Sequence, residues 1–407
     1  MAVPLALRVL AAVFGGLVVV ATWISLVGTL VVSRSVRGRL TRWVDVGVLS
    51  VYRLVTSRMT DFERLDRVLS TQAAAVLMAQ LASWLLLVLA GFTLLLWPFS
   101  SLGITRAFTD AGSSIFTLGF AEPGGSVPAV LVFIAAISGL VIVALQVGYL
   151  PTLYSAFNRR ETEVALLSAR AGIPAWGPEL LARTQYALGP VSTIDTLPGL
   201  YTQWERWAAD VAESHTTYLP LVWFRSPRAR SSWVTALLAV LDSAAMILAL
   251  SPSQAPAVQA RLCLRSGFQC LNRVAQAMGF DIPDEVSNGT QTQLTYDEFL
   301  DAVARLKEVN FPIERDAASA WPDFTGWRVN YERAAYAIAD AVDAVPAMWS
   351  GPRRQGIPPI PPLRPAPGRA MDRHHPLPGP AVENLRGAGQ ARSKPDQPGV
   401  LSTANHR

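Results

Sequence analysis

The chain has 407 residues, of which 51% are hydrophobic and only 16% are charged, and this is not the composition of an ordinary soluble enzyme. Its net charge of +5 does not indicate nucleic-acid binding, because no basic run is interleaved with aromatic residues in a binding motif. The apolar residues are concentrated in three runs, at 9–32, 73–99 and 127–157. A bilayer core of roughly 30 Å is crossed by about 20 helical residues, so each run is long enough to span a membrane.

The first run predicts a transmembrane helix within residues 1–33. Its apolar core is too long for a cleaved signal peptide, and the basic cluster follows the run instead of preceding it. Residues 34–71 carry eight arginines against four acidic residues, which places this partly helical linker in the cytoplasm and the N-terminus outside. The segment 100–126 has one basic and two acidic residues and is expected to face outward. The prediction is a multi-pass protein of the plasma membrane, in contact with the lipid bilayer.

The stretch between the second and third runs, SSIFTLGFAEPGG at 113–125, is neither a plain turn nor another apolar helix. Residues 105–116 have helix-compatible apolar spacing, whereas 117–121 are free of charge and contain a glycine. Non-helical backbone at membrane depth is tolerated only where it is buried in protein or lines a water-filled cavity. Carbonyls that point at an axis can replace the hydration shell of a cation, and the C-terminal end of a half-helix adds partial negative charge. A glycine permits the alternating backbone hand that such an arrangement requires.

The residues from Ser114 to Glu122, SIFTLGFAE, resemble the filter of the two-span potassium channel family, T-x-T-T-V-G-Y-G-D. The resemblance covers about residues 73–160 and implies a pore module at 72–157, made of a span, a pore half-helix, a filter and a second span. It also implies that backbone carbonyls and one hydroxyl coordinate a permeant cation, with no other metal. The implied coordinating residues are Thr117, Leu118, Gly119 and Phe120, and the filter-flanking residues are Ser114, Phe116, Ala121 and Glu122.

Two positions depart from the family pattern. Ala121 stands at the second filter glycine, where a positive φ would cost alanine roughly 1 kcal/mol, and Phe116 replaces a threonine behind the filter. We therefore expect conduction of potassium or sodium rather than strict potassium selectivity. Three gate or hinge candidates follow in the second pore span: Gly139, at the spacing of the family's hinge glycine, Gly148 and Pro151. The alternative role for a small residue here is close helix packing.

Asn158, Arg159 and Arg160 are expected to return the chain to the cytoplasm, where mixed polar and apolar spacing predicts a helical domain at 158–350. The apolar segment 233–250 is ambiguous. An unpaired Asp242 at mid-bilayer would cost about 2.5–3.5 kcal/mol, so we interpret this segment as a buried helix of the domain and not as a fourth span. The expected helices are 161–171, 200–211, 232–250, 257–278, 296–308 and 331–345, the fifth beginning with a capping box between Thr295 and Glu298.

No enzyme is predicted. The domain shows neither a nucleotide-binding loop nor a catalytic or metal-binding cluster, so no cofactor is expected, and its two cysteines, Cys263 and Cys270, are expected to be reduced and partly buried. Residues 351–407 are rich in proline, glycine and arginine and predict a disordered tail. Pro359, Pro362 and Arg364 have the spacing that aromatic grooves recognise. A tail-binding protein is therefore one alternative, and a plain linker is the simpler one.

The combined prediction is an all-α membrane protein that forms a homotetrameric cation channel, because one filter per chain cannot encircle an ion. No nucleic-acid partner is expected. The alternative is a membrane-anchored oligomeric scaffold with a non-conducting pore module, which Phe116 and Ala121 favour. Ion flux separates these two functions, whereas the oligomeric state does not.

Overall fold

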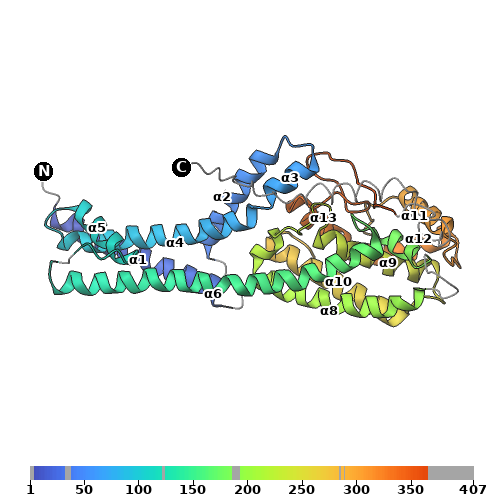
Figure 1. The fold of residues 1–407 in the computed structure, drawn as a ribbon, viewed down its shortest axis with the longest axis horizontal. Coiled ribbons are helices and arrows are strands. Elements are labelled where there is room, and N and C mark those ends of the chain that lie inside the picture. The colour runs from blue at the N-terminus through green and yellow to red at the C-terminus, as the bar shows by residue number, and fades with distance from the viewer. Residues whose placement is uncertain are drawn as a thin grey trace, which may run out of the picture. The chain divides into compact units, whose positions relative to one another are not determined.

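The structure, a computed structural model, describes residues 4–32, 38–121, 124–185, 193–283, 286–287 and 289–364. Over these residues the chain is helical (Figure 1), which confirms the predicted fold class at the level of an all-α protein. The elements are α1 (Leu5–Leu30), α2 (Arg39–Thr56), α3 (Phe62–Leu69), α4 (Gln72–Leu96), η1 (Trp97–Phe99), α5 (Ile104–Ile115), α6 (Ser126–Ala171), α7 (Gly177–Arg183), η2 (Thr193–Thr196), α8 (Leu197–Thr217), η3 (Leu219–Trp223), α9 (Trp233–Leu250), α10 (Ala257–Met278), α11 (Tyr296–Glu308), α12 (Ala317–Arg328) and α13 (Glu332–Ala341).

Four described segments are long and apolar enough to cross a membrane, a pattern compatible with a membrane protein: Leu5–Leu30, Phe62–Phe99, Ser126–Ala171 and Trp233–Leu250. In the first three, 28–39% of the most apolar window is buried inside the chain, whereas 94% of it is buried in the fourth. The first three, which contain α1, α4 and α6, therefore keep long apolar surfaces on the outside. The burial of the fourth, α9, agrees with its interpretation as a core helix.

α1 and α4 cross at a pair of glycines. A Cβ atom on Gly15 would lie 2.5 Å from the Gly91 carbonyl oxygen, and one on Gly91 would lie 3.0 Å from the Gly15 carbonyl oxygen. Backbones can approach this closely only where side chains are absent, which is a common solution for helices that pack in a membrane. Nearer the other end of α1, Trp84 Nε1 donates to Ser25 Oγ at 3.4 Å. The N-terminal helix is thus attached along α4.

α6 is one helix of 46 residues. The sequence predicted an apolar span at 127–157 and a separate helix at 161–171, but the structure joins them without a break. At the junction the Arg160 side chain is fully buried, and the Arg160 carbonyl accepts a hydrogen bond from Trp207 Nε1 of α8 at 3.2 Å. The apolar helix consequently continues into the helical domain with no intervening loop.

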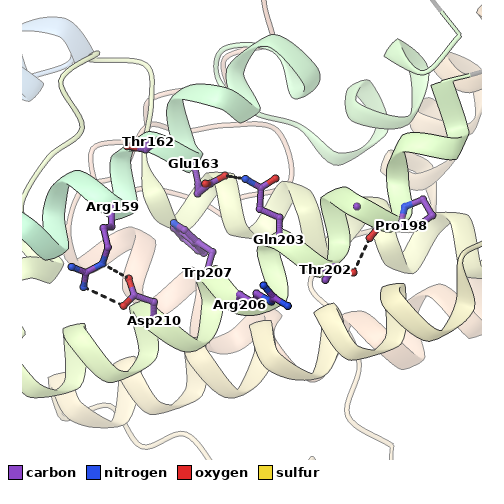
Figure 2. A pocket seen from close by; sticks show the side chains of 10 residues that line it. Arg159, Thr162, Glu163, Pro198, Thr202, Gln203, Arg206, Trp207 and Asp210 are labelled. Carbon is purple, nitrogen blue, oxygen red and sulfur yellow. Dashed lines mark hydrogen bonds and ion pairs between the residues drawn. The ribbon is translucent and has the colours of Figure 1, made fainter.

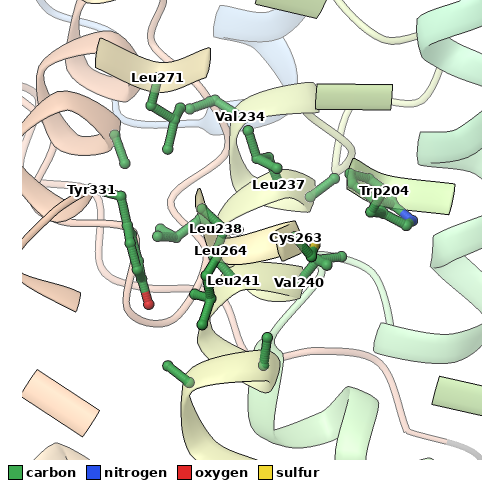
Figure 3. Packing of buried hydrophobic residues seen from close by; sticks show 14 of the residues in the cluster. Trp204, Val234, Leu237, Leu238, Val240, Leu241, Cys263, Leu264, Leu271 and Tyr331 are labelled. Atoms are coloured by element: carbon green, nitrogen blue, oxygen red, sulfur yellow. The ribbon is translucent and has the colours of Figure 1, made fainter. Parts of the chain in front are cut away.

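α9 lies at the centre of the helical domain. It packs against α7, α8, α10, α12 and α13, and Figure 3 shows its leucines beside side chains of α8 and α10. Asp242 of α9 is buried but partnered, because Arg328 Nη1 and the Tyr331 hydroxyl both donate to its Oδ1. Arg328 Nε also donates to Glu332 Oε1 at 2.8 Å. These partners offset part of the cost of burying a carboxylate, which is several kcal/mol for an isolated one.

The helix bounds agree best with the sequence where local signals are strong. α10 and α11 have the predicted bounds, and the capping box between Thr295 and Glu298 is formed. α8 is longer than predicted at both ends, and α13 is shorter. α12 was not predicted, because Pro322 lies inside it and its apolar residues have no clear helical period. In the 34–71 linker, α2 and α3 make most of the described part helical.

Residues 351–364, which the sequence assigned to the start of a disordered tail, contact the helical domain. Arg353 is buried, and its guanidinium donates to five backbone carbonyls, including those of Ala344 at 2.8 Å and Ser350 at 2.9 Å. Farther along, Ile360 N donates to the Pro346 carbonyl at 2.7 Å. Composition did not predict these contacts because they depend on hydrogen bonds with the folded domain rather than on apolar periodicity. The remainder of the predicted tail, 365–407, lies outside the described residues.

Candidate functional site

The predicted half-helix is present as α5, which ends at Ile115. Its buried residues include Ala107, Ala111 and Ile115, and the helix packs between α4 and α6. On its more exposed side Arg106 Nε lies 3.0 Å from Asp110 Oδ1, one turn later. The C-terminal end of α5 leads directly into the filter-like segment, residues 117–121.

The backbone of the filter-like segment is tied to the last turn of α5. Leu118 N donates to the Ser113 carbonyl at 2.8 Å, and the N–H groups of Phe120 and Ala121 donate to Ser113 Oγ at 3.1 and 3.2 Å. A trans peptide is planar, so the carbonyl of the preceding residue points away from each of these N–H groups. The carbonyls of Thr117, Gly119 and Phe120 therefore point away from Ser113. No described residue donates a hydrogen bond to them.

The sign of φ alternates along the same segment. It is positive at Thr117 (53°) and Gly119 (73°), and neither Leu118 nor Phe120 is among the described residues with positive φ. This alternating hand is what the sequence predicted for carbonyls that share a direction. Ala121 also avoids positive φ, so the strain considered for its methyl group does not arise. The strain lies instead at Thr117, because β-branched residues rarely adopt this conformation.

The other predicted site residues lie as follows. Thr117 Oγ1 donates to the Phe116 carbonyl at 2.8 Å, and Ser114 Oγ donates to the Asp110 carbonyl at 2.7 Å. The side chains of Leu118 and Phe120 are 62% and 63% exposed, and Phe116 is 45% exposed. Glu122 lies outside the described residues, and its place at the outer mouth stays a prediction. The structure thus brings together the predicted residues from 114 to 121 at the end of α5.

The three gate or hinge candidates lie in α6 in different surroundings. A Cβ atom on Gly139 would overlap the Ile115 carbonyl oxygen and lie 2.9 Å from the carbonyl carbon. Close packing therefore accounts for this glycine, and its role as a hinge stays a prediction. Gly148 has open space around its Cα, and Pro151 is exposed within the unbroken helix.

Ser113 was not among the residues singled out from the sequence. Its hydroxyl is the acceptor that orients two peptide groups of the filter-like segment, and its side chain is almost fully buried. The available signal was a hydroxyl residue in the last turn of a helix, followed by backbone that cannot hydrogen-bond within that helix. That signal is shared with Ser114, whose hydroxyl bonds within α5 instead.

We expect Ser113→Ala to loosen the filter-like segment. The change leaves two partly buried N–H groups without their acceptor, at a cost of about 1–3 kcal/mol each. Hydrogen–deuterium exchange of residues 117–121 should speed up markedly in the variant. Thr109→Ala is the matched control, since Thr109 Oγ1 donates only to the Thr105 carbonyl within α5. Equal exchange in both variants would contradict the role given to Ser113.

Comparisons with known proteins give no neighbour for this site. No family model, no curated protein and no solved structure matches the chain.

A second cluster joins α6 to the helical domain around Arg160. The fully buried guanidinium donates to Glu161 Oε1 at 2.8 Å and to the carbonyls of Leu221 and Phe224 at 2.8 and 2.7 Å. Its Nη1 also lies 2.9 Å from His215 Nε2 of α8. Because an arginine can only donate, His215 Nε2 must accept, so its imidazole is neutral.

Acid is expected to weaken this cluster. Burial and the neighbouring Arg160 charge lower the pKa of His215 well below its ordinary value of 6.5. His215 therefore binds a proton more readily in the unfolded chain than in the folded chain. Its contribution to the free energy of unfolding is complete above about pH 6.5, the pKa in the unfolded chain, and is lost as the pH falls through the lower pKa in the folded chain. Thermal unfolding between pH 7.5 and 5.5 should show this loss, and His215→Gln should flatten the dependence. An unchanged pH dependence in that variant would contradict the assignment.

A groove of 830 Å³ lies between α6 and α8 (Figure 2). Several of its polar side chains bond to each other: Arg159 donates twice to Asp210 at 3.2 Å, and the Gln203 amide Nε2 donates to the Glu163 carboxylate at 2.6 Å. These contacts hold α8 against α6 and bring no nucleophile next to a base. Within the described residues there is also no group of three or more side chains that could hold a metal ion.

Proposed function

We propose that the chain is the subunit of an oligomeric channel for potassium or other monovalent cations. Four copies would surround one axis, and each would contribute the carbonyls of residues 117–120 together with the Thr117 hydroxyl. The single observation that carries the proposal is the orientation of the filter-like backbone, in which Ser113 holds three N–H groups and the carbonyls of Thr117, Gly119 and Phe120 are turned away from it. Such carbonyls are the ligands that replace a cation's hydration shell.

Two further features support a pore. The C-terminal end of α5, where a helix carries partial negative charge, lies directly beside these carbonyls. The large apolar side chains of Leu118 and Phe120 are exposed in the single chain, and neighbouring copies would cover them. The long apolar surfaces of α4 and α6 allow the module to sit at membrane depth. The second span would continue, as α6, into the helical domain.

Cation flux into liposomes tests the proposal, with inward gradients of potassium and sodium compared. Gly119→Ala places a methyl group at a φ of 73°, at a cost of about 1 kcal/mol in each copy, and we expect it to reduce flux by about tenfold or more. Gly326→Ala is the matched control, because a Cβ there meets nothing within 4 Å and the residue lies in α12. Flux in the unmodified chain and the control, reduced in the filter variant, is the expected result.

The same liposomes also test the alternative function, a membrane-anchored oligomeric scaffold that does not conduct ions. Chemical cross-linking in the liposomes reports whether oligomers form, independently of flux. Oligomers without flux, or flux that is equally strong in Gly119→Ala, would overturn the proposed conduction through residues 117–120. Oligomers without flux would leave the membrane-anchored scaffold as the better function.

A further inference from the structure

α2 leaves more large apolar side chains exposed than a surface helix in water does, although Leu40, Leu49 and Tyr52 pack inward and are half-buried. Its buried residues, on the side of α1 and α4, are all polar: Thr41, Asp45 and Thr56. Its outward face carries large apolar side chains that are 52–77% exposed, namely Trp43, Val51, Leu54 and Val55, whereas Val46, although exposed, lines a cavity between α2 and the end of α10. A helix in water buries its apolar stripe and exposes its polar one. The outward face of α2 therefore requires an apolar neighbour.

Hydrogen bonds fix this orientation. Gln80 Nε2 of α4 donates to Asp45 Oδ1 at 2.6 Å. Thr41 Oγ1 lies 3.3 Å from Ser25 Oγ and 3.1 Å from Thr29 Oγ1, both in α1. Turning the apolar face inward would break all three contacts. The exposure of the apolar face is thus built into the packing of α2.

The charge of the outward surface identifies the neighbour. Arg39, Arg42 and Arg53 are exposed, the last two at the edge of a cavity between α2 and the end of α10, whereas Asp45, the one acidic residue of α2, is buried. An exposed helix surface that combines tryptophan, aliphatic side chains and arginines without acids matches the boundary between acyl chains and anionic headgroups. A second protein copy would not require this excess of positive charge.

We propose that the outward face of α2 lies in the cytoplasmic interface of the bilayer and binds anionic lipid. Trp43 and Leu54 enter the boundary of the acyl chains, and the three arginines reach the lipid phosphates. The place of α2 in the chain agrees, since it packs against both α1 and α4. Figure 1 shows it at the end of α4 that is far from α5. This inference does not depend on ion conduction.

Spin labelling of the full-length chain in vesicles tests the inference. A nitroxide on Leu54→Cys is compared with one on Val258→Cys, an exposed apolar residue of α10 in the helical domain. The vesicles contain phosphatidylcholine with phosphatidylglycerol. Collision rates are measured with oxygen, which concentrates among acyl chains, and with a nickel chelate, which stays in water. The native Cys263 and Cys270 are fully buried, and burial raises the pKa of the Cys270 thiol to about 12, so both should resist labelling. Treating the unmodified chain with the same nitroxide reagent checks that the native cysteines are not labelled.

The label at position 54 is expected to collide with oxygen and to be protected from nickel, whereas the label at 258 shows the reverse. Two results would overturn the inference. A label at 54 that meets nickel as often as the label at 258 would mean that α2 faces water. A label at 54 shielded from both reagents and broadened by a second spin would mean that another copy covers α2.

The role of charge is tested by the triple variant R39Q/R42Q/R53Q in the Leu54→Cys background. Each arginine near an anionic surface is expected to favour membrane contact about fivefold. Protection from nickel should therefore rise with the fraction of phosphatidylglycerol in the parent and lose this dependence in the triple variant. If protection of the parent's label from nickel does not change with the fraction of phosphatidylglycerol, the binding of anionic lipid is refuted.

Discussion

Replacing Arg328 with alanine is expected to lower the free energy of unfolding of the helical domain by about 3–5 kcal/mol. The side chain is fully buried and bonds to Asp242, Glu332, Tyr336 and the Trp349 carbonyl. Its removal leaves two carboxylates in an apolar core without their cation. Breaking a buried pair from one side costs far more than the pair itself contributes, because the remaining charge cannot reach water.

Denaturant unfolding of the detergent-solubilised chain, followed by tryptophan fluorescence, measures this effect. Arg273→Ala is the matched control: its ion pair with Glu213 is 61% and 76% exposed, and such pairs contribute about 0–1 kcal/mol. Arg328→Lys should restore only part of the stability, since an ammonium group cannot reproduce the planar set of donors. A loss for Arg328→Ala as small as that of the control would refute the structural role of the cluster.

Gly139→Ala is expected to displace α5 from α6. Alanine favours a helix over glycine by about 1 kcal/mol, but its methyl group would overlap the Ile115 carbonyl oxygen. Overpacking of this kind typically costs about 1–3 kcal/mol, so the clash outweighs the gain in helix propensity. The backbone of α5 must move, and the filter-like segment moves with it.

Hydrogen–deuterium exchange of residues 113–121 reports this displacement, and cation flux reports its consequence for the proposed pore. Gly112→Ala in α5 is the control, because its Cβ would meet Leu89 Cδ1 at an ordinary 3.8 Å. The two roles of Gly139 give different results. If the glycine serves only as a hinge, flux changes while exchange of the segment stays as in the parent. Faster exchange together with lost flux supports close packing.

Local sequence signals predicted much of the fold. α10 has a regular apolar period and ends at Gly279 in a left-handed conformation, and α11 begins with the capping box of Thr295. α5 was predicted from apolar spacing, with bounds that differ by one residue. These features depend on residues within a turn or two of each other. These features can therefore be predicted from the sequence without knowledge of the tertiary structure.

Features that depend on distant partners were not predictable in the same way. Burial of Asp242 was expected, but its partner Arg328 is 86 residues away and no local pattern connects the two. The contact of residues 351–364 with the domain rests on Arg353 and the carbonyls it binds, which are brought together only in the folded domain. Within the candidate site, the alternating hand of the backbone was expected, whereas its acceptor, Ser113, was not; whether the carbonyls face an axis stays a prediction.

The unbroken course of α6 makes it a lever arm. Gly139 and Arg160 are separated by 21 residues of one helix, or about 31 Å at 1.5 Å per residue. A tilt of one degree about the Arg160 cluster shifts a rigid helix by about 0.5 Å at Gly139, which is comparable to the tolerance of a close backbone contact. The hinge candidates Gly148 and Pro151 lie between these two points. How stiff these few residues are determines how strongly movement of the helical domain reaches the end of α5.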